Sequence, residues 1–225
     1  AVIEIGMNHP GETARLAAIA APTIALVNNA QREHQEFMSS VAEVAREHGA
    51  LLEALKSDGV AVINADDEYS GYWRGQAAGR RVCDFGLDGA AQVSARSVAG
   101  AANDIELRTP VGTARIVLHI DGRHNVRNAC AAAACALAAG ASLDAVAYGL
   151  AAFRAVEGRS QRRSTLSGAI LIDDSYNANP DSARAAIDVL AGLPGKRILV
   201  LGDMGEVGAR GDKFHHEVGR YARDR

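Results

Sequence analysis

Two adjacent carboxylates end an apolar run in the second half of the chain. The residues Ile170–Ile172 are followed by Asp173 and Asp174, then by small polar residues, Asn179 and Pro180. This order predicts a buried strand, a polar loop and a helix that begins at Asn179, with Pro180 at the first helical position, where its missing N–H is no loss. Open α/β sheets bind ligands at the carboxyl ends of such strands. From these residues alone, an ordinary βα loop is an equally good interpretation.

A carboxylate and a histidine near the start of the chain could form a second site. Glu4 lies inside the apolar run Ala1–Ile5, which reads as a strand, and a lone buried carboxylate needs a partner, a proton or a metal. His34 follows a second predicted strand, Thr23–Val27, on its carboxyl side. If the strands are parallel neighbours, both side chains share a cleft and could hold Mg²⁺ beside phosphates. From the residue chemistry alone, a capped carboxylate and a surface histidine are favoured.

A third group of polar residues stands at a predicted helix start behind Gly122. His124, Asn125 and Asn128 could contact a base, while the helix N-terminus favours an anion. Plain N-capping explains Asn125 equally well. Arg159 could reach a phosphate, although a solvated linker charge is the default interpretation. The sequence contains neither the dinucleotide fingerprint G-x-G-x-x-G nor the P-loop motif G-x-x-x-x-G-K-[ST].

The elements that would position these residues alternate between strands and helices. We expect helices over Glu12–Ala20 and Phe37–Lys56, and the second carries His48 on its apolar face, where most histidines are satisfied core residues. A turn at Pro110–Gly112 predicts a hairpin. The expected strands are Val60–Ile63, Arg81–Phe85, Gln92–Val98, Asp104–Thr109 and Thr113–Ile120. This pattern predicts an α/β fold with a mainly parallel sheet, flanking helices and a small antiparallel side sheet.

The chain continues with two Ala-rich helices and a polar junction. The first helix runs to Ala139 with Gly140 as its stop, and Ser142 can cap the second. The polar residues Arg154–Gly168 are predicted to join two domains. Beyond them we expect a βαβ unit and then a final helix. Its parts are the strand Ala169–Ile172, the helix Asp181–Ala191 and the strand Arg197–Leu201.

Composition excludes several classes of function. The net charge of -3, without a long basic run, gives no electrostatic case for nucleic acid or acidic membranes. Three cysteines without a CxxC pattern suit a reducing cytoplasm. The longest apolar run, Ala129–Ala139, is too short to span a bilayer. Because residue 1 is not Met and Glu217–Arg225 reads as an unfinished helix, we expect an internal fragment of a longer protein.

Taken in order, these motifs resemble the Mur ligases that finish the peptidoglycan precursor. Residues 4–12, E-I-G-M-N-H-P-G-E, are similar to the family stretch E-L-G-x-N-H-x-G-E. The resemblance covers nearly the whole chain, and D-D-S-Y-N-A-N-P together with G-D-M is its most specific part. The motifs that follow in family order are Asn28-Asn29 with His34, Gly122–Asn125 with Asn128, Gly158-Arg159, Asp173–Pro180 and Gly202–Met204.

The resemblance implies an ATP- and Mg²⁺-dependent ligase that adds D-alanyl-D-alanine to UDP-N-acetylmuramoyl-tripeptide through an acyl phosphate. It implies three domains in the whole protein. Residues 1–157 would be the central ATPase domain after its P-loop, and residues 158–225 the first part of a Rossmann-like C-terminal domain. We therefore expect the chain alone to be inactive. A cytoplasmic bacterial monomer that neither binds nucleic acid nor inserts into membranes is also implied.

The same resemblance assigns roles near the metal. Glu4 and His34 match metal-ligand positions, which reverses the interpretation from residue chemistry alone. Asn8 and His9 lie beside them and would face the substrate. Many Mur ligases carry a carbamylated lysine that binds a second Mg²⁺, and His48 stands where that lysine aligns. A histidine cannot be carbamylated, so the second metal is held differently, Glu47 or His48 substitutes, or the alignment slips by one residue. We treat His48 as a candidate catalytic residue.

A larger set matches the nucleotide-binding positions of the family. Asp174 would accept from the ribose hydroxyls, and Arg159 would contact a phosphate. The remaining residues would contact or line the adenine, namely His124, Asn125, Asn128, Tyr176, Asn177 and Asn179.

Two alternatives stay open beside this interpretation. One is another amide ligase of the superfamily, such as a folylpolyglutamate synthetase type, against which the S-Y-N-A-N-P loop and the G-D-M motif argue. The other is a non-catalytic nucleotide-binding module, because the chain lacks the P-loop groups that cradle the β- and γ-phosphates.

Overall fold

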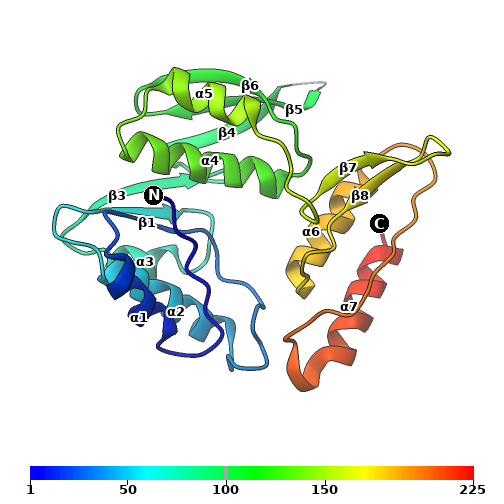
Figure 1. Cartoon of the computed structure of the whole chain (residues 1–225), viewed down its shortest axis with the longest axis horizontal. Helices are drawn as coiled ribbons and strands as arrows, with labels where there is room; N and C mark the ends of the chain where they lie inside the picture. The colour runs from blue at the N-terminus through cyan, green and yellow to red at the C-terminus, as the bar shows by residue number, and fades with distance from the viewer. Residues whose placement is uncertain (99–100) are drawn as a thin grey trace.

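A six-stranded sheet organises the first part of the chain (Figure 1). The structure is a computed structural model and describes residues 1–98 and 101–225. β1 to β4 pair in parallel, whereas β4, β5 and β6 pair antiparallel and continue the same sheet. The predicted fold class is confirmed, including the hairpin. In sheet order the strands are β1 (Ile24–Val27), β2 (Val60–Asn64), β3 (Arg81–Gly86), β4 (Val93–Val98), β5 (Ala101–Thr109) and β6 (Gly112–Val117).

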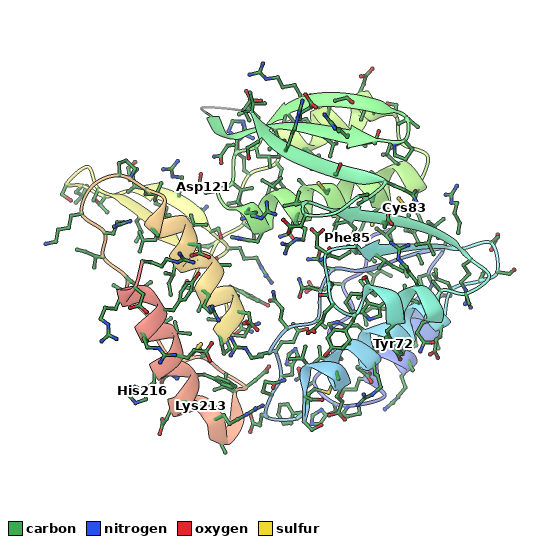
Figure 2. The ribbon with its side chains drawn as sticks, turned by 180° about the vertical axis from the view of Figure 1, so that it is seen from behind. Tyr72, Cys83, Phe85, Asp121, Lys213 and His216 are labelled. Atoms are coloured by element: carbon green, nitrogen blue, oxygen red, sulfur yellow. The ribbon has the colours of Figure 1, made fainter. Side chains whose placement is uncertain are left out.

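Helices cover both faces of this sheet. One face packs against α2 and α3, with α1 outside against α2, and the other packs against α4 and α5, so that every residue of β2 is buried. Phe85 (Figure 2) lies in the core on the α4 side. Trp73 lies in the core on the α2 side. The helices are α1 (Glu12–Ala20), α2 (Val41–Glu53), α3 (Ser70–Gln76), α4 (Arg123–Ala138) and α5 (Leu143–Ala152). We call residues 1–157 the sheet unit.

The remaining residues, 158–225, form a smaller C-terminal unit beside the sheet unit (Figure 1). A two-stranded antiparallel sheet joins β7 and β8, and α6 packs against α7 through a small core around Ile187, Phe214 and Val218. Lys213 and His216 are exposed on α7 (Figure 2). The elements are β7 (Gln161–Ser164), β8 (Ile170–Asp173), α6 (Pro180–Ala191), the 3₁₀ turn η1 (Gly208–Arg210) and α7 (Gly211–Arg223). None of the helices in the described part of the chain is long and apolar enough to cross a membrane.

Two predicted strands are wrong. Ala1–Ile5 is irregular, because it pairs with no described strand even though β1 is the edge of the sheet, and Val2 and Ile3 are exposed. Arg197–Leu201 is also irregular and exposed. A strand needs a neighbour to accept its backbone hydrogen bonds, and apolar sequence alone does not supply one.

The expected βαβ unit is therefore wrong as well. β8 pairs antiparallel with β7, a strand that lies inside the polar segment Arg154–Gly168, where the sequence predicted a domain junction and no strand. The sequence Gln161–Ser164 is polar and lacks the apolar alternation that marks a strand. Its register with β8 places Arg162 opposite Ile172, so the hairpin forms through backbone pairing of a polar strand with an apolar one.

The helices α2, α5 and α6 each begin behind a residue whose side chain caps the first turn. Asn179 accepts hydrogen bonds from the backbone N–H groups of Asp181 and Ser182 and forms a capping box, with Pro180 at the start of α6, as predicted. Ser142 caps α5, and Gly140 closes α4 with a φ of 89°. The helix predicted from Phe37 begins only at Val41, because the Ser40 side chain accepts from Glu43 and caps it there.

Candidate active site

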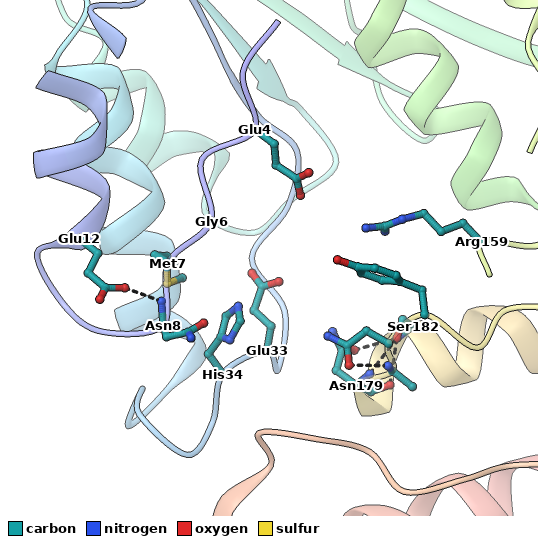
Figure 3. Close-up of a pocket in the computed structure, with 13 residues that line it drawn as sticks. Glu4, Gly6, Met7, Asn8, Glu12, Glu33, His34, Arg159, Asn179 and Ser182 are labelled. Carbon is teal, nitrogen blue, oxygen red and sulfur yellow. Dashed lines mark hydrogen bonds between the residues drawn. The ribbon is translucent and has the colours of Figure 1, made fainter. Parts of the chain in front are cut away.

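A cleft of about 600 Å³ lies between the two units and collects candidate residues from both (Figure 3). From the sheet unit it is lined by the segment that precedes α1 and by the loop that follows β1. From the C-terminal unit it is lined by Arg159 and by the loop between β8 and α6. The predicted residues that line it are Glu4, Asn8, His34, Arg159, Tyr176, Asn177 and Asn179.

The predicted meeting of Glu4 and His34 in one cleft is found, although not for the predicted reason. Glu4 is exposed and sits on irregular backbone rather than in a buried strand. Its carboxylate extends across the cleft toward Arg159 (Figure 3). The loop after β1 brings His34 to the same cleft, as expected for a residue at the carboxyl end of a parallel strand.

His34 has an unusual backbone and a partner from the other unit. Its φ of 51° lies in the left-handed region, which is uncommon for a residue with a β-carbon. Its Nδ1 atom lies 2.5 Å from Oε2 of Glu206, in the loop before η1. The imidazole therefore carries an interaction that joins the sheet unit to the C-terminal unit.

Glu33 is a residue of this cleft that the sequence did not reveal. Its Oε1 atom is buried without a hydrogen-bond partner among the described residues, and its carboxyl faces the cleft beside His34 (Figure 3). Burial raises the pKa of Glu33, and the nearby His48 and His34 offset part of that rise. The only available signal was its place next to His34, because nothing in a polar loop marks one carboxylate as buried.

His48 and Glu47 do not line the cleft, and they make different contacts outside it. His48 Nδ1 lies 3.1 Å from the carbonyl oxygen of Asn29 and its Nε2 lies 3.4 Å from Glu33 Oε1, so the ring sits behind Glu33 without lining the cleft. Glu47 accepts hydrogen bonds from the backbone N–H groups of Gly11 and Thr13 at 2.9 and 2.8 Å. Its carboxylate therefore holds the N-terminus of α1.

The opposite wall includes Arg159 and Tyr176, whereas Asp174, two residues before Tyr176, does not line the cleft. The Arg159 guanidinium lies 4.1 Å from the ring centre of Tyr176, a cation–π contact, and the Tyr176 N–H donates to the carbonyl of Gly158. Asp174 accepts from both the N–H and the hydroxyl of Ser160, at 2.7 and 3.1 Å. The β8–α6 loop and the segment before β7 thus hold each other in place.

His124, Asn125 and Asn128 lie at the start of α4 and do not line the cleft. Asn125 does not cap the helix: its amide donates to the Asp121 carbonyl. Asn128 accepts from the Asn28 amide at 3.0 Å, which ties α4 to the end of β1. Burial lowers the pKa of His124, with Asp174 opposing and Arg127 adding to this effect.

Of the two residues expected to face the substrate, only Asn8 lines the cleft. Its backbone N–H donates to the Glu12 carboxylate at 2.7 Å. The His9 ring packs against Phe37, with ring centres 4.5 Å apart, and lies outside the cleft lining.

The donor set suits a hard divalent cation, although the described residues contain no ready cluster of three metal-binding side chains. Glu4 and Glu33 offer carboxylate oxygens and His34 an imidazole nitrogen to one cleft. The Oε1 atom of Glu33 makes no hydrogen bond with a described residue, and it lies 3.4 Å from His48 Nε2 behind the cleft. Mg²⁺ commonly takes one or two carboxylates and fills its shell with water and substrate phosphates, so these residues fit it in kind.

Two family models match the chain in the order of its two units. The model for the Mur ligase middle domain matches residues 1–136, and the model for the Mur ligase glutamate ligase domain matches residues 158–225. This chain belongs to the Mur ligase family. The membership inferred from its motifs is confirmed.

Several similar proteins are Mur ligases of one type. The UDP-N-acetylmuramoyl-tripeptide–D-alanyl-D-alanine ligase of Escherichia coli is 41% identical over 99% of this chain, which covers 50% of that protein. A crystal structure of MurF from Acinetobacter baumannii superposes with a TM-score of 0.94 at 32% identity, over 100% of this chain and 49% of the other.

MurF from Thermotoga maritima in complex with ADP has a TM-score of 0.85 and 25% identity, over 97% of this chain and 50% of the other. The chain thus spans about half the length of the Mur ligases that it matches.

Proposed function

We propose that this chain is part of a MurF-type ligase, which joins D-alanyl-D-alanine to UDP-N-acetylmuramoyl-tripeptide with ATP in the bacterial cytoplasm. The observation that carries the proposal is the cleft between the two units, which gathers Glu4, His34, Arg159 and Tyr176 from four separate motifs. Similarity along 99% of the chain to a UDP-N-acetylmuramoyl-tripeptide–D-alanyl-D-alanine ligase supports it. The relative solved with ADP supports ATP as the nucleotide.

The proposed reaction consists of two successive displacements. The terminal carboxylate of the tripeptide attacks the γ-phosphorus of ATP, the bond to the β,γ-bridging oxygen breaks, and ADP leaves. The amine of D-alanyl-D-alanine then attacks the acyl carbon and gives up a proton. The tetrahedral intermediate collapses by breaking its bond to the phosphorylated oxygen, which releases phosphate. Such chemistry depends on positioning and on neutralising charge.

The chain's own residues would serve this reaction by binding and orientation. In this proposal, Arg159 contacts a phosphate from its place over Tyr176, and Asp174 accepts from the ribose hydroxyls. Glu4 and His34 hold Mg²⁺, which when bound neutralises charge on the transferring phosphate. The adenine lies toward Asn177 and Asn179, with His124, Asn125 and Asn128 behind it, and Asn8 faces the substrate.

We also propose that the two units are separate domains, the central ATPase domain over 1–157 and the start of a Rossmann-like domain over 158–225. The turn at Gly158, whose φ is 71°, supports a boundary there. In this proposal, the 225-residue chain alone has no ligase activity and binds ATP weakly, because its sequence contains no P-loop motif.

A substrate panel on the complete ligase tests the function. Phosphate release is measured with ATP, UDP-N-acetylmuramoyl-tripeptide and D-alanyl-D-alanine, and compared with a parallel reaction containing a folate and glutamate. We expect release only when both the nucleotide peptide and the dipeptide are present. Release with the folate and glutamate instead would assign the chain to a folylpolyglutamate synthetase type, and ATP binding without turnover would assign it to a non-catalytic module.

A further inference from the structure

One short loop of the sheet unit makes most of the polar contacts with the C-terminal unit. We call residues 32–36, which follow β1, the docking loop. Arg32 donates to Asp181, at the start of α6, from Nε at 3.0 Å and from Nη2 at 2.5 Å. It also donates to Glu217 of α7 at 2.9 Å. One guanidinium therefore joins the docking loop to two helices of the other unit.

The same loop also touches the segment before α7. The Glu36 N–H donates to the backbone carbonyl of Glu206 at 3.1 Å, and Arg210 donates to the Gln35 side chain at 2.8 Å. Gly208 lies so near that an added β-carbon would be 3.1 Å from the Cα of Glu36. The position of Glu206 is thus fixed against the docking loop by backbone contacts as well as by side chains.

His34 and Glu206 meet across this interface, with Nδ1 and Oε2 2.5 Å apart. Both residues have left-handed backbones, with φ of 51° and 56°. Such conformations are sparsely populated outside glycine and persist where surrounding contacts hold them, commonly at functional sites. Two of them on the two sides of one hydrogen bond show that the interface specifies this pair.

The hydrogen bond between His34 and Glu206 determines which nitrogen of the His34 ring can bind a ligand. A carboxylate acceptor at Nδ1 keeps the proton there, so the lone pair of a neutral His34 lies on Nε2. Nε2 makes no hydrogen bond with a described residue. Histidines that bind metals commonly donate their other N–H to a carboxylate, which fixes the tautomer, orients the ring and raises the basicity of the ligating nitrogen.

We propose that Glu206 is a positioning residue for His34: it fixes the ring with Nε2 free for a ligand, and it does so only when the two units are docked. The C-terminal unit thereby completes a site whose direct ligands lie in the sheet unit. The benefit to cation binding rests on the proposed function, in which His34 holds Mg²⁺.

Histidine ¹⁵N spectra test the positioning role directly. Long-range ¹H–¹⁵N correlation spectra of the 225-residue chain are recorded at about pH 8, above the ordinary histidine pKa of about 6.5, and His34 is assigned by its loss in His34→Gln. We expect the Nδ1–H tautomer in the wild type, loss of that preference in Glu206→Ala, and partial recovery in Glu206→Gln, whose amide oxygen can still accept. Arg32→Ala weakens the contact between the two units but keeps the Glu206 side chain. We expect it to move the His34 ¹⁵N signals toward those of Glu206→Ala.

Asp212 provides the matched control for Glu206. Asp212→Asn removes an exposed carboxylate of the same unit, at the start of α7, and is expected to leave His34 unchanged. Backbone spectra confirm that each variant is folded. If folded Glu206→Ala keeps the wild-type tautomer of His34, the positioning role is refuted.

Titration with Mg²⁺ alone separates this inference from the proposed function. We expect Mg²⁺ to shift the His34 Nε2 signal in the wild type, and its affinity to fall about 10- to 100-fold in Glu206→Ala, as for other partners of metal-bound histidines. If Mg²⁺ shifts His34 with equal affinity in both proteins, the benefit assigned to Glu206 is refuted. If it leaves wild-type His34 unchanged, the cation role in the proposed function fails, and the tautomer comparison still decides whether Glu206 positions the ring.

Discussion

The Arg32 guanidinium and the Asp181 carboxylate form a two-pronged ion pair between the sheet unit and the C-terminal unit. The Arg32 backbone N–H donates to the same carboxylate at 3.0 Å. The side chains are 22% and 26% exposed, so the pair is partly shielded from water. Because Asp181 lies in the first turn of α6, its charge also interacts favourably with that helix N-terminus.

Arg32→Ala should destabilise the chain by about 2–3 kcal/mol, because it removes charge-assisted hydrogen bonds and leaves two carboxylates without their cation. Urea unfolding measures the change. The matched control is Arg108→Ala, which removes an arginine 55% exposed in the β5–β6 hairpin and should cost less than about 1 kcal/mol. Equal losses of unfolding free energy in the two variants would show that the interface ion pair stabilises the chain no more than an exposed one.

The same pair should make stability depend on acid pH. Burial alone would raise the pKa of Asp181, but the hydrogen bonds from Arg32 outweigh it and the pKa is lowered; Arg32 likewise lowers the pKa of Glu217. Carboxyls with lowered pKa contribute stability above their ordinary pKa of about 4 and lose it as pH falls through the folded value. The difference in unfolding free energy between wild type and Arg32→Ala should therefore shrink below about pH 4. A constant difference at all pH values would contradict this.

The cysteine thiols should react slowly in the folded chain. Their ionisation should lower the free energy of unfolding at alkaline pH. Burial raises the pKa of Cys130 to about 12 and that of Cys135 to about 11, from an ordinary value of 9.0. The unfolded chain loses these protons first, so the stability due to the neutral thiols is full below about pH 9 and falls as pH rises. We expect slow labelling by a thiol reagent at neutral pH, and a flatter alkaline stability profile in Cys130→Ala. Rapid labelling of all three thiols in the folded chain would refute the burial argument.

Asp174→Ala should raise the KM for ATP in the complete ligase by about tenfold, equivalent to ~1.4 kcal/mol of lost hydrogen bonding. The fold should survive, because Asp174 is exposed and its hydrogen bonds with described residues all come from Ser160. Glu157→Ala, an exposed carboxylate nearby, serves as the control. An unchanged KM in Asp174→Ala would remove this residue from the nucleotide site.

His48→Ala should slow turnover in the complete ligase more than it weakens ATP binding. The ring lies behind Glu33 and bonds to the carbonyl of Asn29, so its loss would disturb the cleft carboxylates rather than the nucleotide wall. Initial rates and ATP affinity are measured in parallel, with His216→Ala, an exposed histidine of α7, as the control. Turnover equal to the wild type would exclude a role for His48 in catalysis.

Local patterns predicted much of the sheet and its helices, because the spacing of apolar residues and the capping residues both act over a few positions. The Asn179 and Pro180 start of α6 and the Ser142 cap needed no tertiary information. Ala1–Ile5 and Arg197–Leu201 have strand-like composition but pair with no described strand, and pairing is a property of the whole fold.

The site could be predicted only in part. The sequence predicted that Glu4 and His34 could share one cleft, and the structure brings both to one cleft together with Arg159. Glu33 and Glu206 were missed, because the burial of one and the partner of the other depend on how the two units meet. No local spacing encodes a contact between residues as far apart in sequence as His34 and Glu206.

The most direct test of the proposed chemistry follows one oxygen atom. The complete ligase is supplied with ATP, D-alanyl-D-alanine and UDP-N-acetylmuramoyl-tripeptide carrying ¹⁸O in its terminal carboxylate, and the products are analysed by mass spectrometry. We expect the UDP-N-acetylmuramoyl-pentapeptide, with one ¹⁸O transferred to each phosphate released, because the carboxylate oxygen attacks phosphorus and leaves with it. Pentapeptide formed with no ¹⁸O in the phosphate, or no pentapeptide at all, would contradict an acyl-phosphate ligase.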